Sequence, residues 1–388
     1  MSGPFRLLLI GDSDSQLLAC EALCRFPSEL NVQVTINAIP REGTPDTILK
    51  RAAALGELWR LEMGQLLTHP ELHDFDAIGV YLTGSKISDF RQALGLLPSR
   101  ERPLLFCGFN GVVLEKYMEG MSWRLGYDLI CLSGPRDREA LERMLESSPF
   151  SGQRTVLTGL HRQTSSDQSQ LSQEQRRKQL VFAEQVVMPS SSADRAEMVR
   201  ILSDLAQRSP NWEVLIKPRI APGETTFHST TEHISTTLQL ALGHPPENLR
   251  LDYRPLPDLL GQARLMATVS STAFFDALDV GCRPVVMADF GINPANGSHV
   301  FAGSGVWRCL DQVEDLDALD RSLPSPDPDW LAWMGYGTNL DPVELIEALR
   351  QLRADPPERL STTSGYLSNA NLSFTQLRRD AEQAIGQK

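Results

Sequence analysis

Short apolar segments alternate with longer amphipathic ones along most of this chain. An apolar run at residues 5–10 precedes a polar turn and then residues 16–26, where Leu18, Ala22 and Phe26 fall at helical spacing. Further strand-like segments lie at residues 31–39, 75–82, 103–107, 127–132 and 154–158, and helix-like segments lie between them, notably at residues 45–67 and 137–145. Strands that alternate with helices at this spacing predict a parallel sheet with helices on both faces, and hence an α/β fold.

The alternation stops once and then restarts. Residues 161–179 are rich in Gln, Ser and Arg and almost without apolar side chains, which predicts a linker. Beyond it, strands are expected at residues 180–188, 212–216, 249–253, 265–269 and 283–288, with helices between them. A length of 388 residues also fits two domains. We therefore expect two Rossmann-like domains that face each other across a cleft.

The expected domain bounds follow from these composition shifts. They are residues 1–160 for the first domain, 161–179 for the linker, 180–350 for the second domain and 351–388 for a C-terminal segment. In that segment Phe374, Leu377, Ala381 and Ile385 recur at helical spacing and form one narrow apolar stripe. A helix with so narrow a stripe is not stable alone, so it must dock on another surface or stay frayed.

Composition excludes several classes of protein. The 37 Lys+Arg and 49 Asp+Glu give a net charge of −12, which argues against a nucleic acid as the main partner. No apolar run approaches the ~20 residues that span a bilayer, and the opening residues lack the features of a signal peptide. The six Cys are scattered, so a disulfide scaffold is not expected. We expect a cytoplasmic protein, and peripheral contact with a membrane stays open.

A polar cluster follows the first strand. Residues 11–15 read Gly-Asp-Ser-Asp-Ser and stand directly before a helix. In an open α/β sheet, ligands bind beyond the carboxyl ends of the strands, so Asp12 or Asp14 could bind substrate or act as a base. The alternative is a helix N-cap, but two carboxylates exceed what one cap requires. We favour Asp14 as the base, because Asp12 lies closer to the strand and suits a capping or turn role.

The same residues look like the start of a GDS-type esterase, with Ser13 as the nucleophile. That chemistry needs a His base, usually three residues after an Asp near the C-terminus. None of the seven His residues has Asp at that position, so we do not favour the esterase interpretation.

Two cations stand at the end of a strand in the second half of the chain. Lys217 and Arg219 flank Pro218, and Glu224 and His228 lie just downstream. An Arg supplies a fork and a Lys a point charge, so together they could hold a phosphate. A solvated basic loop is the alternative.

Three hydroxyl residues form a third cluster. Ser270, Ser271 and Thr272 stand between a strand and a helix, where N–H groups and the helix dipole favour an anion. A cap needs only one hydroxyl, so we expect a phosphate site. Metal signals are weak by comparison: Cys20 and Cys24 have no Cys/His pair at finger spacing, and we expect no metal.

Taken together, the second and third clusters resemble the C-terminal half of GT-B glycosyltransferases. The similarity is greatest to bacterial capsule and surface-polysaccharide enzymes that use CMP- or CDP-linked donors. Those enzymes carry a strand ending in Lys-Pro, then a Ser-Ser/Thr segment, Glu-Ala-Leu and Gly-Lys-Pro-Val-Val. The matching residues here are Lys217-Pro218, 270–272, 276–278 and 281–286. The opening cluster and residues 106–116 are similar to a poorly characterised bacterial family of glycosyltransferases.

The resemblance implies a mechanism. The nucleotide-sugar donor, which is a substrate rather than a cofactor, would lie mainly on the second domain, with its phosphate on Lys217, Arg219, Ser270, Ser271 and Thr272, and with Glu224 beside it. A hydroxyl of a glycan or glycolipid acceptor would enter from the first domain and lose its proton to Asp14 or Asp12. The better-known relatives have His where this chain has Arg219, so an acid at that position is lost, and His228 is its candidate substitute.

The same resemblance implies that no metal is bound and that the last helix returns to the first domain. The implied role is the synthesis of surface polysaccharide or glycolipid. Two rivals use the same architecture: a CDP-polyol phosphotransferase, and a nucleotide-sugar epimerase or binding protein.

Overall fold

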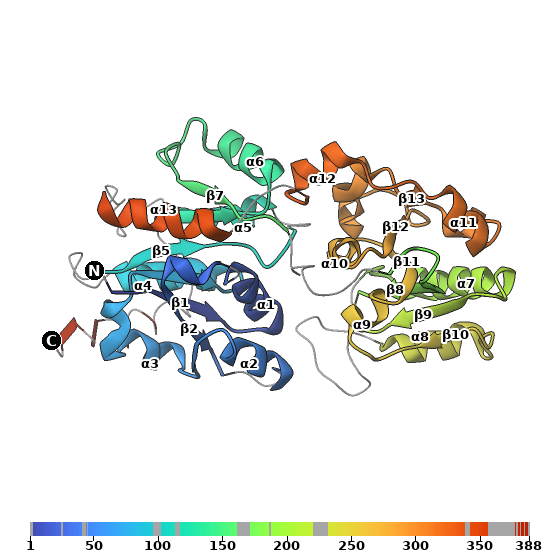
Figure 1. Cartoon of the computed structure of the whole chain (residues 1–388), viewed down its shortest axis with the longest axis horizontal. Coiled ribbons are helices and arrows are strands. Elements are labelled where there is room, and N and C mark those ends of the chain that lie inside the picture. Colours follow the sequence, from blue (N-terminus) through green and yellow to red (C-terminus); the bar gives the residue numbers. More distant parts are fainter. Residues whose placement is uncertain are drawn as a thin grey trace. The chain divides into compact units, whose positions relative to one another are not determined.

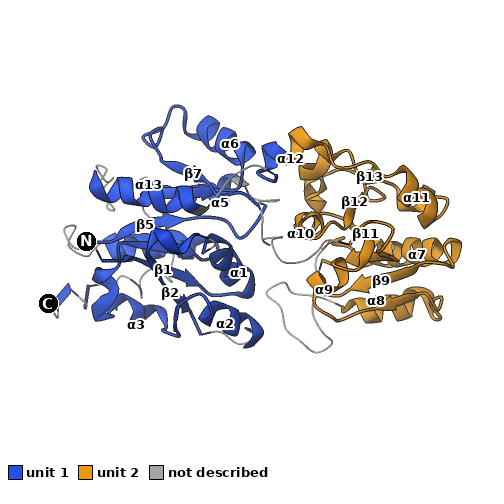
Figure 2. Cartoon of the chain, in the orientation of Figure 1, with its two compact units in different colours: residues 1–160, 332–388 blue, residues 161–331 orange. Residues whose placement is uncertain are grey.

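The chain folds into two α/β units (Figure 1). The computed structural model describes residues 3–24, 26–40, 44, 46–95, 102–112, 117–160, 171–185, 188–219, 232–337 and 342–355, together with seven residues between 377 and 386. Unit 1 comprises Met1–Leu160 and Ala332–Lys388, and unit 2 comprises His161–Leu331 (Figure 2). Unit 1 is therefore assembled from both ends of the sequence.

Unit 1 contains a seven-stranded sheet in the order β3-β2-β1-β4-β5-β6-β7, in which every pairing is parallel. The strands are β1 (Phe5–Gly11), β2 (Val32–Ala38), β3 (Glu57–Trp59), β4 (Ala77–Tyr81), β5 (Leu104–Cys107), β6 (Leu129–Leu132) and β7 (Thr155–Leu157). The helices of its first segment are α1 (Asp14–Leu23), α2 (Asp46–Ala53), α3 (Met63–Leu67), α4 (Ser85–Gly95), α5 (Tyr117–Ser122) and α6 (Pro135–Leu145).

Unit 2 contains a six-stranded parallel sheet in the order β10-β9-β8-β11-β12-β13. The strands are β8 (Arg177–Ala183), β9 (Glu213–Lys217), β10 (Leu249–Leu251), β11 (Ala263–Thr268), β12 (Arg283–Met287) and β13 (Trp307–Arg308). The α-helices are α7 (Ser192–Arg208), α8 (Ile234–Leu242), α9 (Leu256–Leu260), α10 (Ala273–Asp279) and α11 (Leu316–Ser322). Then α12 (Pro328–Met334) spans the division between the units, and α13 (Pro342–Ala354) belongs to unit 1.

The pleat of β1 separates two apolar cores in unit 1. Leu7 and Leu9 point into one core, which they share with α1, α2 and α13. Leu8 and Ile10 point into the other, which they share with α3, α4, α5 and α6. Alternate residues of a strand face opposite sides of a sheet, so a strand buried on both faces is apolar throughout. This confirms the helix-covered parallel sheet expected from the alternation.

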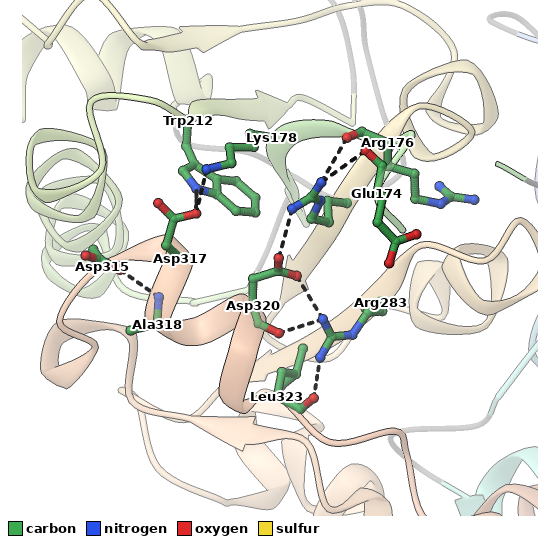
Figure 3. Close-up of polar contacts among 11 residues, drawn as sticks. Glu174, Arg176, Lys178, Trp212, Arg283, Asp315, Asp317, Ala318, Asp320 and Leu323 are labelled. Carbon is green, nitrogen blue, oxygen red and sulfur yellow. Dashed lines mark hydrogen bonds and ion pairs between the residues drawn. The ribbon is translucent and has the colours of Figure 1, made fainter. Parts of the chain in front are cut away.

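At the amino edge of the unit 2 sheet, half-buried and exposed polar contacts join α11 to the strands (Figure 3). Asp320 of α11 pairs with Arg264 at 3.1 Å and with Arg283 at 2.8 Å. Asp317 accepts from the Lys178 ammonium at 2.8 Å and from the Trp212 indole N–H at 3.0 Å. These contacts fasten α11 to the starts of β8, β11 and β12, which leaves the carboxyl edge available for other roles.

Three local predictions were wrong. Residues 45–67 were expected to be one helix, but β3 lies between α2 and α3 and pairs with β2. The strand expected at residues 180–188 begins at Arg177 and ends at Ala183. Residues 177–179, expected in the linker, therefore belong to β8: Arg177 and Lys178 are exposed at the start of the strand, and the buried Gln179 side chain donates to the Glu213 carboxylate. The linker's residues 161–170 lie outside the described residues.

The second domain also ends earlier than predicted. Unit 1 resumes at Ala332 rather than near residue 351, and α13 supplies four buried side chains to the core around β1. These side chains are Leu345, Ile346, Leu349 and Leu352. Their helical spacing shows that α13 is amphipathic, but amphipathicity alone does not say which sheet a helix covers.

Two glycines lie where the chain re-enters unit 1. Gly335 has φ +91°, and a Cβ there would lie 1.9 Å from the carbonyl oxygen of Ser133. A Cβ on Gly134 would lie 2.4 Å from the Gly335 nitrogen. The Leu160 N–H donates to the Gly335 carbonyl oxygen at 3.0 Å. The chain therefore leaves unit 1 and returns to it at neighbouring positions, through a backbone contact that only glycine permits.

The described part of the C-terminal tail contacts unit 1. Leu377 and Ile385, two members of the predicted apolar stripe, pack against the core that contains Leu8 and Ile10. Phe374 and Ala381 lie outside the described residues. The contacts agree with the expectation that the tail returns to the first domain.

Removal of the tail before Ser373 should lower the melting temperature. Two apolar side chains would lose their packing against the core of unit 1, and one kcal/mol corresponds to about 2–4 °C for a domain of this size. Differential scanning fluorimetry measures the effect. Leu377→Asp with Ile385→Asp in the full chain should reproduce the loss. Unchanged stability after truncation would show that the tail is dispensable for the fold.

Candidate functional site

Both sheets reverse their strand order at the same point. In unit 1 the chain proceeds from β1 to one side through β2 and β3, and then crosses to β4 on the other side. In unit 2, β8 has the same position between β9 and β11. Ligands of open α/β sheets bind beyond the carboxyl ends of the strands at such a reversal. The loops after β1 and β4, and those after β8 and β11, are therefore the candidate sites.

The two predicted cations lie at the carboxyl end of β9. Lys217 is the last residue of that strand and is half-buried, and its ammonium donates to the Pro218 carbonyl oxygen at 2.6 Å. The Arg219 side chain is exposed, and its backbone N–H donates to the Glu184 carboxylate at 2.9 Å. The structure thus places Lys217 and Arg219 at the carboxyl end of a strand, the end at which open α/β sheets generally bind ligands.

The three hydroxyl residues lie at the carboxyl end of β11. Ser270 is fully buried, whereas Ser271 and Thr272 are partly exposed. The Ser271 hydroxyl accepts the Ala273 N–H at 3.2 Å, and Thr272 is the N-cap residue of α10 without a side-chain capping bond. The hydroxyls therefore differ in kind: Ser270 faces the protein interior, and the other two lie nearer solvent.

Glu184 and Gln185, directly after β8, join these two segments. Glu184 contacts the loop after β9, as described above, and the Gln185 side-chain oxygen accepts the Ser270 N–H at 3.0 Å. The Gln185 amide also donates to the Ser270 hydroxyl at 3.2 Å. The sequence analysis assigned both residues to the interior of a strand and so missed them. A carboxylate beside an amide at the end of an apolar strand was the available signal.

In unit 1 the two candidate carboxylates have different surroundings. Asp12 is 4% exposed, and its carboxylate lies 2.7 Å from the Lys86 ammonium on α4. This ion pair bridges the loops after β1 and β4, which is the point of strand reversal. Lys86 was not predicted, although a Lys in the first turn of a helix that follows a strand was visible in the sequence.

Of the two roles expected for Asp12, capping or turn, the structure shows the turn. The N-cap residue of α1 is Ser13, and Asp14 is the first residue of the helix. The Asp12 N–H donates to the Gln16 side chain at 2.6 Å, so Asp12 belongs to the turn that precedes α1. Asp14 is partly exposed. Of the two carboxylates, Asp14 is therefore the more accessible to a substrate.

Two other candidates cannot be placed. Glu224 and His228 lie outside the described residues. Within the described ranges, no group of three or more His, Cys, Asp or Glu side chains could hold a metal ion. Cys20 belongs to the core around β1, and the partly buried Cys24 packs against that core: the Cys24 thiol donates to the Cys20 carbonyl oxygen, and burial raises the pKa of Cys24 to about 12. In the part of the chain that the structure describes, no helix has the length and apolarity to cross a membrane.

The fold defines the class of enzymes built from two Rossmann-like domains, to which the GT-B glycosyltransferases belong. The fold is similar to a crystal structure described as a "putative UDP-N-acetylglucosamine 2-epimerase from Listeria monocytogenes". The TM-score is 0.58 at 15% identity, over 92% of this chain and 100% of that one. The MnaA–UDP structure from S. aureus has a TM-score of 0.56 at 11% identity, over 92% and 99%. At these identities the similarity establishes the fold.

The family is established by sequence. Residues 7–352 match the family described as "Putative glycosyltransferase (DUF6716)", and the chain belongs to it. None of the curated proteins compared with the chain is similar enough in sequence to count as a match. The expected GT-B-like α/β fold and the expected glycosyltransferase class are thus confirmed.

Proposed function

We propose that this glycosyltransferase moves a sugar from a nucleotide-activated donor to a hydroxyl of a glycan or glycolipid, in the synthesis of surface polysaccharide. One observation carries the donor assignment. Lys217 at the end of β9 with Arg219 just after it, and Ser271 and Thr272 after β11, lie at the carboxyl ends of the two strands that neighbour β8. Cations and partly exposed hydroxyls at neighbouring strand ends suit the diphosphate of a nucleotide sugar.

The proposed reaction has one bond formed and one broken. Asp14 takes the proton of the acceptor hydroxyl, and the oxygen attacks the anomeric carbon of the donor. The bond from that carbon to the phosphate oxygen breaks, and Lys217 and Arg219 stabilise the negative charge that develops on the leaving nucleotide. Such stabilisation is generally the largest single contribution to catalysis of this kind.

A thermal-shift screen with CMP, CDP, UDP and GDP tests the donor site. A nucleotide at 100 times its dissociation constant should stabilise the protein by about 2.7 kcal/mol. The sequence resemblance favours a cytidine nucleotide, whereas MnaA was crystallised with UDP, so the screen also decides the base. No shift with any of the four nucleotides would contradict the proposed donor site.

A second candidate is a nucleotide-sugar epimerase, because the similar Listeria monocytogenes structure is described as a putative UDP-N-acetylglucosamine 2-epimerase, and the similar S. aureus structure is a complex with UDP. Epimerisation needs no acceptor. Incubation with UDP-N-acetylglucosamine alone, followed by NMR of the sugar, separates the two functions. Inversion at C2 of the sugar without an acceptor would show that the protein is an epimerase rather than a transferase. An unchanged sugar would favour the transferase.

Loss of either cation should weaken donor binding. Arg219→Ala and Lys217→Ala each remove a charge-assisted contact of roughly 1.5–3 kcal/mol, which corresponds to about 10- to 150-fold in nucleotide affinity. Thr272→Ala should have a smaller effect if backbone N–H groups carry most of the contact there. Calorimetry with the nucleotide found in the screen measures the affinities.

Lys178→Ala is the matched control for these variants. It removes the same charge from the amino edge of the same sheet, where Lys178 pairs with Asp317. Nucleotide affinity should stay within about twofold, since the two sheet edges lie at opposite ends of the strands. Equal affinity in the wild type and both cation variants would remove Lys217 and Arg219 from the donor site.

A further inference from the structure

A buried ion pair lies beneath the proposed donor site. The Glu184 side chain is 4% exposed and the Arg195 side chain 8%, and their charged atoms are 2.9 Å apart. Glu184 directly follows β8, and Arg195 lies in the first turns of α7. Neither residue takes part in the mechanism proposed above.

Both residues of this pair also contact neighbouring segments of the chain. One Glu184 oxygen pairs with Arg195, and the other accepts the Arg219 N–H at 2.9 Å. A second Arg195 nitrogen donates to the Gln185 carbonyl oxygen at 3.2 Å. Gln185 in turn holds Ser270 through both ends of its amide. One connected set of bonds therefore runs from the loop after β9, through β8, to the loop after β11.

Such a pair is poorly explained by stability alone. The free energy lost when two charges leave water offsets much of the free energy gained from their attraction. Apolar residues of similar size often stabilise a fold as well as a buried ion pair does. What a carboxylate adds is direction, because its two oxygens fix two N–H groups in defined orientations. Here one of those N–H groups is the backbone N–H of Arg219, so Glu184 fixes the position from which the exposed Arg219 side chain extends.

We infer that Glu184 is a positioning residue that holds the backbone of Arg219 so that its guanidinium meets the donor phosphate. Arg195 keeps the Glu184 carboxylate oriented. Gln185 fixes Ser270, at the start of the loop before α10, relative to the same segment after β8. The inference rests on the proposed function, because it assigns Arg219 to a nucleotide phosphate.

The test uses a variant that removes the acceptor without stranding a buried charge. Glu184→Leu with Arg195→Met should weaken UDP, or the nucleotide found in the screen, by about tenfold. Glu184→Gln with Arg195→Met keeps one side-chain oxygen for the Arg219 N–H and should restore most of the affinity. Glu197→Leu with Arg200→Met makes the same replacements in an exposed pair on the same helix and should leave affinity unchanged.

A double-mutant cycle separates positioning from general damage. In an Arg219→Ala background, Glu184→Leu with Arg195→Met should have no further effect on affinity, because the side chain that Glu184 positions is absent. An additive, tenfold further loss would overturn the inference and show that the pair acts only on the fold.

The failures of the two proposals are distinguishable. If Arg219→Ala weakens binding and the Glu184→Leu, Arg195→Met variant does not, the positioning role is wrong and the donor site stands. If the wild type binds none of the nucleotides, the proposed donor site is wrong and the positioning role falls with it. The variant Glu184→Leu with Arg195→Met could fail to fold. In that case nucleotide affinity is compared between two other proteins: Glu184→Gln with Arg195→Met, and the same pair of substitutions combined with Arg219→Ala. Equal affinity in those two proteins would overturn the inference.

Discussion

Asp14→Asn should reduce turnover by about 10²- to 10⁴-fold while the nucleotide thermal shift is retained. The amide has almost the same shape as the carboxylate but cannot take a proton. Asp14 lies in unit 1, and the residues proposed to hold the phosphate lie in unit 2, so donor affinity should not change. Single-turnover transfer to an acceptor, together with the thermal shift, measures both quantities on the same protein.

Asp46→Asn is the control for this variant. Asp46 is also the first residue of a helix in unit 1, and its side chain is exposed. The interaction of an acidic side chain with a helix N-terminus is worth about 0.3–1 kcal/mol, so both variants should lose similar, small stability. Only Asp14→Asn should lose turnover. Normal turnover in Asp14→Asn would place the base elsewhere, with Asp12, Glu224 and His228 as the next candidates.

The second large effect concerns stability. Arg176 is 3% exposed and precedes β8, and its guanidinium donates to the carbonyl oxygens of Leu260 at 3.0 Å, Ala263 at 2.9 Å and Val280. Two of these carbonyls lie at the C-terminal ends of α9 and α10, where a cation is favoured. Burial lowers the pKa of Arg176, and the surrounding carbonyl oxygens accept hydrogen bonds from its guanidinium in place of water.

Arg176→Met should therefore lower the free energy of unfolding by about 3–5 kcal/mol, because each buried carbonyl that loses its donor costs roughly 1–3 kcal/mol. Urea unfolding followed by circular dichroism measures the change. Arg177→Met removes the same charge from the adjacent, exposed residue and should change stability by less than about 0.5 kcal/mol. Equal stability of the two variants would show that the Arg176 contacts are energetically neutral.

Sequence patterns predicted the structure correctly where they are local. The apolar runs that became β1, β4, β5 and β6 are short and buried on both faces, and they were found because such runs can be little else. The patterns failed at β3, a strand of three residues, because three residues carry too little periodicity to interrupt a helical pattern.

The candidate site was predicted in the same uneven way. Lys217, Arg219, Ser271 and Thr272 were predicted as candidates because loops after strands are the places where α/β proteins bind ligands, and the structure places them at strand ends. Lys86, Glu184 and Gln185 were missed, because each acts through a partner far away in the sequence. Lys86 lies 74 positions from Asp12, and Gln185 lies 85 positions from Ser270.

The sequence by itself determined that the chain forms two parallel α/β sheets, since the alternation of apolar strands and amphipathic helices stops and restarts. It also determined which loops carry charge and hydroxyl groups. Only the tertiary structure decided that α13 completes the core of unit 1, because an apolar helix face fits many sheets and only the full set of packed side chains selects one. It also decided that β8 lies between β9 and β11, which brings Glu184 and Gln185 to the loops on either side of it. Strand order depends on contacts between residues distant in sequence, and no local pattern contains them.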